Sequence, residues 1–71
     1  MSAAPIWLQP DGAPIACREK LRVLDENHAE LATVMQDAFE DAVLMGVDPD
    51  VAREAISLLI ARLRLPGQGA A

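Results

Sequence analysis

A single apolar stripe with helical spacing runs through the middle of this 71-residue chain. Its members recur at intervals of three and four residues, which is the a/d pattern of a heptad seam. They are Leu21, Leu24, His28, Leu31, Met35, Ala38, Ala42 and Met45. A seam of this kind has to be covered by other helices. So short a chain has few residues with which to cover it, and this limits what it can fold into.

Composition favours an all-α single domain. Apolar residues make up 52% of the chain, and many of them are Ala, which favours helix. Tyr is absent, and there is one Phe and one Trp. A lone core of this size commonly gives only about 3–5 kcal/mol. With one Cys and no Cys/His cluster, neither an intramolecular disulfide nor a structural zinc is available, so we expect oligomerisation.

The formal charge of −5 argues against a nucleic-acid partner, because phosphate contacts need concentrated Lys and Arg. We expect no export signal and no membrane span. Arg outnumbers Lys five to one, which favours a bacterial source. A cytoplasmic location is expected, because a reducing compartment suits the lone Cys17. It is interpreted as a passive thiol, although a helix N-terminus can lower the pKa of such a group.

The first 14 residues are expected to form an extended arm. Pro5, Pro10 and Pro14 exclude helix there, and Pro10-Asp11-Gly12 is a reverse-turn pattern. Such a turn can fold the Ile6-Trp7-Leu8 segment onto the helix that follows.

Residues 15–65 are expected to form a helical hairpin. A long helix should span about 15–45 and a short one about 49–64, and residues 66–71 should be a flexible tail. The Gly-Val-Asp-Pro sequence at 46–49 supplies a left-handed cap, an N-cap Asp and a Pro at the first helical position.

The hairpin is not expected to stand alone. The short helix is apolar over most of its circumference, and it cannot reach Leu21 and Leu24, so either the arm or a second protomer must cover them. We therefore expect a homodimer forming an antiparallel four-helix bundle. The predicted interface residues are Leu21, Leu24, His28, Leu31, Met35, Ala38, Ile56, Leu59 and Leu63. This layout resembles that of the Rop family of plasmid regulators, in which helical hairpins dimerise; the resemblance transfers no functional residue.

Two places invite a functional interpretation. Asp25 and His28 lie on one face of the long helix, as metal ligands do in carboxylate-bridged bundles. The competing interpretation makes His28 a polar residue that sets the register of the seam. Trp7 is either packed on its own bundle or an anchor for a larger protein partner, since Trp is enriched at interface hot spots.

The leading hypothesis is a small non-enzymatic interaction module, an adaptor or regulatory subunit, with no cofactor. Paired carboxylates for catalysis need a cleft that shifts their pKa values, and a short hairpin offers none. The alternatives left open are a metal-binding bundle using Asp25 and His28 and, more weakly, a transcriptional or RNA regulator.

Overall fold

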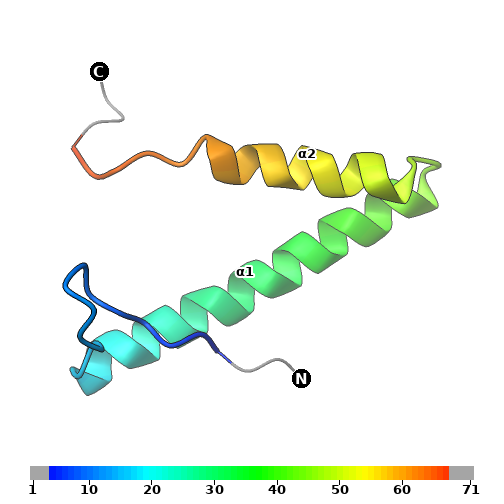
Figure 1. Ribbon diagram of the computed structural model, residues 1–71. Coiled ribbons are helices and arrows are strands. Elements are labelled where there is room, and N and C mark those ends of the chain that lie inside the picture. Colours follow the sequence, from blue (N-terminus) through cyan, green and yellow to red (C-terminus); the bar gives the residue numbers. More distant parts are fainter. Residues whose placement is uncertain (1–3, 68–71) are drawn as a thin grey trace. The chain divides into compact units, whose positions relative to one another are not determined.

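The structure, a computed structural model, describes residues 4–67. It contains two helices, α1 (Arg18–Leu44) and α2 (Pro49–Ala61), and no strand within this range (Figure 1). The prediction of an all-α chain is confirmed, and two helices joined by a short turn fit a helical hairpin. The chain divides into two units within α1, after Val34, and each unit is described by itself. Of the predicted tail, residues 68–71 lie outside the described residues.

The helix bounds correct the predicted ones. α1 begins at Arg18 rather than near residue 15, and α2 ends at Ala61 rather than near residue 64. Pro14 does not open the helix, because it pairs with Leu8 in an isolated antiparallel bridge. The carbonyl of Cys17 accepts the N–H of Leu21 at 3.0 Å, so Cys17 is the N-cap residue of α1.

The arm closes on itself through a four-residue turn. The N–H of Gly12 donates to the carbonyl of Gln9 at 2.9 Å, and the N–H of Gln9 donates to the carbonyl of Ala13 at 2.7 Å. The Asp11 carboxylate accepts the N–H of Ala13 at 2.9 Å. Gly12 has a φ of 91°, a value that glycine adopts without a steric cost. The N–H of Ile15 then donates to the carbonyl of Trp7 at 2.9 Å, which holds the two sides of the arm together.

α1 ends in a glycine cap. The N–H of Gly46 donates to the carbonyl of Val43 at 3.0 Å, and the N–H of Val47 donates to that of Ala42 at 2.9 Å. These are the two hydrogen bonds of a Schellman motif, in which the residue after the helix end is left-handed. Gly46 has a φ of 105°, and a Cβ built there would meet nothing within 4 Å.

α2 begins immediately after this cap. The Asp48 side chain accepts the N–H groups of Asp50 at 2.9 Å and Val51 at 3.2 Å, while Pro49 occupies the first turn. Both groups would otherwise be unsatisfied helix donors. The start of α2 is therefore fixed by local chemistry alone.

Each unit has a small apolar centre. The half-buried side chains of the first unit are Trp7, Ile15, Leu21, Leu24 and His28, and those of the second are Met35, Phe39, Ala42, Val43 and Ile56. Within residues 4–67 only Ala52, at 5% exposure, is buried. Most of the apolar surface of both helices is consequently open to solvent.

The half-buried positions of α1 depart from the heptad seam in its second half. Ala38 is exposed, whereas Phe39, which is not a member of that seam, is half-buried. The guanidinium of Arg53, on α2, lies over the Phe39 ring at 4.9 Å from its centroid. An α-helix of 3.6 residues per turn drifts by about 20° per heptad from a 3.5-residue repeat, and this drift favours position 39 over 38.

Candidate functional site

The arm is anchored to α1 by Trp7. The indole Nε1–H donates to Oδ1 of Asp25 at 2.9 Å. The indole ring also meets the imidazole of His28 edge-to-face, with centroids 5.9 Å apart and planes at 80°. These are two specific contacts between residues far apart in the sequence, so they define how the arm lies on the helix.

The contacts of Trp7 indicate which segment covers Leu21 and Leu24, the first two residues of the apolar seam. Leu24 lies one turn before His28, and Leu21 one turn before Asp25. Both leucines are half-buried in a unit made only of the arm and the first part of α1. Within this unit, the arm is the segment beside them, and Figure 1 shows it in blue next to the first turns of α1.

Asp25 and His28, the candidate metal ligands, are brought together around Trp7. The Asp25 carboxylate is occupied by the indole N–H, and the face of the helix that they share is the face that receives the arm. In the part of the chain that the structure describes, no group of three or more His, Cys, Asp or Glu residues is placed to hold a metal ion.

Cys17 is exposed at the N-terminus of α1. The backbone N–H of Lys20 has the largest effect and lowers the pKa of the Cys17 thiol. Burial, the next largest effect, raises this pKa, and the N–H of Glu19 and the Lys20 charge lower it. Thiolates at helix N-termini are stabilised in this way. The sequence does not predict the role of this residue as the N-cap, because Pro14 favours a helix that begins near residue 15.

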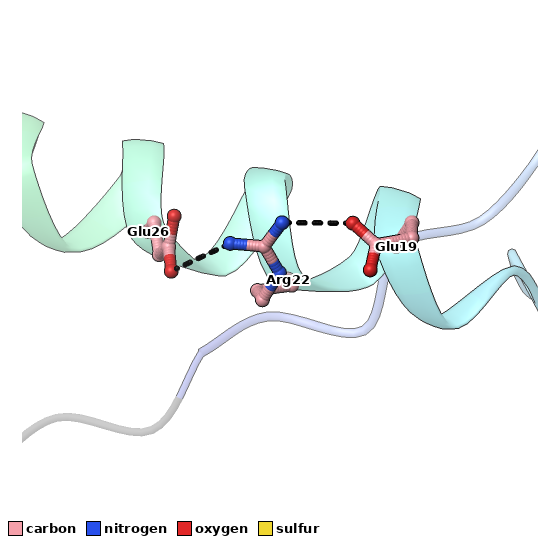
Figure 2. Close-up of polar contacts among 3 residues, drawn as sticks. All are labelled: Glu19, Arg22 and Glu26. Atoms are coloured by element: carbon pink, nitrogen blue, oxygen red, sulfur yellow. Dashed lines mark hydrogen bonds and ion pairs between the residues drawn. The ribbon is translucent and has the colours of Figure 1, made fainter.

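The basic start of α1 is locally neutralised at Arg22. Its guanidinium lies between Glu19, at 2.8 Å, and Glu26, at 3.4 Å, one turn away on either side (Figure 2). The Glu19 hydrogen bond raises the pKa of Arg22 above its ordinary value, with Glu26 adding to the effect. Exposed pairs of this kind contribute little to stability. They do reduce the charge that this end of α1 can offer to another chain.

α2 carries an apolar face on which burial decreases along the helix. Ala52 is 5% exposed and Ile56 is half-buried, but Leu59 is 59% exposed and Leu63, just beyond the helix, is 79% exposed. All four recur at helical spacing, so one face changes from covered to uncovered. Among the predicted interface residues, Leu21, Leu24, His28, Met35 and Ile56 are half-buried, and Leu31, Ala38, Leu59 and Leu63 are exposed.

A second apolar face of α2 lies beside the first. We call Val51, Ala55 and Leu58 the outer face of α2; all three are exposed, Val51 by 58% and Leu58 by 54%. Two adjacent apolar faces on one 13-residue helix are more than a single neighbouring helix can cover.

The comparisons with known proteins add no family. No protein-family model, no curated protein and no solved structure matches the chain. Within the described residues, neither helix is long and apolar enough to cross a membrane.

Proposed function

We propose that this protein is a small helical interaction module, a cytoplasmic adaptor or regulatory subunit that works by assembly rather than by catalysis. Its basic form is a homodimer in which two hairpins build a four-helix bundle, and a larger protein partner can dock on that bundle. The observation that carries the proposal is the uncovered apolar surface of α2.

The physical reason is the free energy of burying that surface. Each fully buried Leu or Val contributes about 1.5–3 kcal/mol relative to its exposed form. Val51, Leu58, Leu59, Ile60 and Leu63 are each more than half exposed. Contiguous apolar patches on soluble monomers are small, and larger ones mark interaction sites. Covering these side chains in a dimer recovers free energy that a single chain forgoes.

Sedimentation velocity over a series of concentrations tests the proposal. We expect a species of twice the 7.6 kDa chain mass to increase with concentration. Leu63→Glu should shift the distribution toward monomer, because it places a charge in the uncovered face. Ser57→Glu, at a position that is also exposed, is the matched control and should leave the distribution unchanged.

A monomer alone at about 1 mM, a concentration that populates even a complex with a Kd of about 100 µM, would refute the homodimer. Far-UV circular dichroism of both variants shows whether helix content is retained, so that a loss of assembly is not confused with a loss of folding.

A further inference from the structure

We propose that the outer face of α2 (Val51, Ala55 and Leu58) is the docking surface for α2 of a second copy, and that the two α2 helices run antiparallel. This inference rests on the proposed assembly function and specifies which surface pairs, with which partner, and in which direction.

The outer face has the spacing that helix pairing needs. Val51, Ala55 and Leu58 recur at intervals of four and three residues, and the next position of the series is Arg62, the C-cap residue at the end of the helix. That is the alternation of a and d positions in a two-helix seam. The neighbouring face is covered at Ala52, the buried residue, and at the half-buried Ile56, whereas all three residues of the outer face are exposed. The outer face remains for a partner.

Charge along α2 identifies the partner as a second α2 in the opposite direction. The first half of the helix region is acidic, with Asp48, Asp50 and Glu54. The single cation of this half is Arg53, whose guanidinium lies 3.7 Å from Asp50 and over the Phe39 ring. Arg53 therefore contacts residues of its own chain.

The end of the helix region is basic. Its cation is Arg62, the C-cap residue. α2 therefore has opposite charges at its two ends. An antiparallel copy places each basic end beside an acidic start, whereas a parallel copy places like charges together.

The register follows from two of these charges. Glu54 lies four residues before Leu58 and Arg62 four residues after it. A two-fold axis near Leu58 therefore sets Glu54 of each copy opposite Arg62 of the other. Within one copy the same two residues are about 12 Å apart along the helix, too far to pair with each other.

A charge exchange tests this pairing. Glu54→Arg and Arg62→Glu should each weaken the dimer, raising its Kd about tenfold by replacing two attractions with two repulsions. The double variant restores both pairs in reversed order, and its Kd should return to within about threefold of wild type. In the double variant, a cation lies nearer the start of α2 and an anion lies at its end, which the helix dipole disfavours. A recovered Kd in the double variant therefore cannot come from a more stable helix.

Glu30→Arg on α1 is the matched control, an exposed Glu with the same change of charge. It should change the Kd far less than Glu54→Arg does. Sedimentation equilibrium gives each Kd, and circular dichroism gives the helix content of each variant.

The outcomes separate the two proposals. A wild-type chain that stays monomeric removes both of them. A wild-type dimer whose Kd is unchanged in the single variants, or is not recovered in the double variant, leaves the assembly function intact and overturns the antiparallel α2 pairing. A 1:1 complex with a different protein on the outer face, with no homodimer, also overturns it.

Discussion

At the scale of single residues, Trp7 and Asp25 form the one side-chain hydrogen bond that the structure gives between the arm and α1 in residues 4–67. Asp25→Ala removes the acceptor and should loosen the arm, at a cost of about 0.5–1.5 kcal/mol. Trp7 is the only Trp in the chain, so its fluorescence reports directly on the arm. We expect emission to shift to longer wavelength and acrylamide quenching to increase.

Asp37→Ala is the control for that experiment, because it removes an exposed carboxylate of α1 that follows Asp25 by about three turns of helix. It should leave the emission of Trp7 unchanged. Equal emission from wild type and Asp25→Ala would contradict the anchoring role.

The lowered pKa of Cys17 predicts a thiol that is more reactive in the folded chain than in the unfolded one. The rate of alkylation by iodoacetamide follows the thiolate fraction, so its pH midpoint should be lower for the native protein than in urea. Because the folded pKa lies below the unfolded one, the linked stability is fully present above the unfolded pKa and is lost as pH falls through the folded pKa. Coincident midpoints in the two states would show that the helix N-terminus does not act on the thiol.

At the scale of elements, the connection between the helices is stabilised by local hydrogen bonds that cap the end of α1 and the start of α2. Asp48→Ala removes the acceptor for two N–H groups of α2 and should cost about 1 kcal/mol of unfolding free energy. Thermal unfolding followed at 222 nm measures the loss. Asp48→Asn keeps a good capping side chain and should retain most of the stability.

Gly46→Ala should cost about 1–2 kcal/mol for a different reason. A Cβ there meets no neighbouring atom, so the cost comes from the left-handed backbone and not from a clash. Chemical denaturation measures it. A variant as stable as wild type would mean that the helix end relaxes to another conformation.

The sequence predicts the two helices more accurately than it predicts the residues at which they begin and end. Apolar spacing predicts both α1 and α2, because amphipathic periodicity is a property of the residues alone. The start of α1 could not be predicted from Pro14, since that proline is used in a bridge with Leu8 across the arm. The indole contact with Asp25 and the half-burial of Phe39 likewise depend on what packs against each helix, which spacing does not encode.

At the scale of the whole molecule, assembly predicts that thermal stability depends on protein concentration. A native dimer that unfolds to monomers is stabilised by mass action, so its Tm should rise as the chain is concentrated. Leu63→Glu should remove most of this dependence. A wild-type Tm that stays constant over a hundredfold range of concentration, on the order of 5–500 µM, would contradict a dimer that dissociates as it unfolds.

The candidate site is less predictable than the fold at this scale. Leu21 and Leu24 stand out in the sequence as positions that α2 cannot cover, but the arm becomes their neighbour only through the contacts of Trp7 with Asp25 and His28. The apolar patterns of α2 do predict a need for further neighbours. They do not identify those neighbours. The identity of the partner is therefore inferred from the charges along α2, and the proposed experiments test it.

Within residues 4–67, Ala52 is the one buried side chain, and this has a calorimetric consequence. The heat-capacity change of unfolding grows with the apolar area that becomes hydrated, and an isolated chain has little such area left to hydrate. The dilute protein should therefore give a broad, shallow endotherm with a small ΔCp. In the dimer, the outer face of α2 also becomes hydrated on unfolding, so the peak should sharpen and ΔCp per chain should increase.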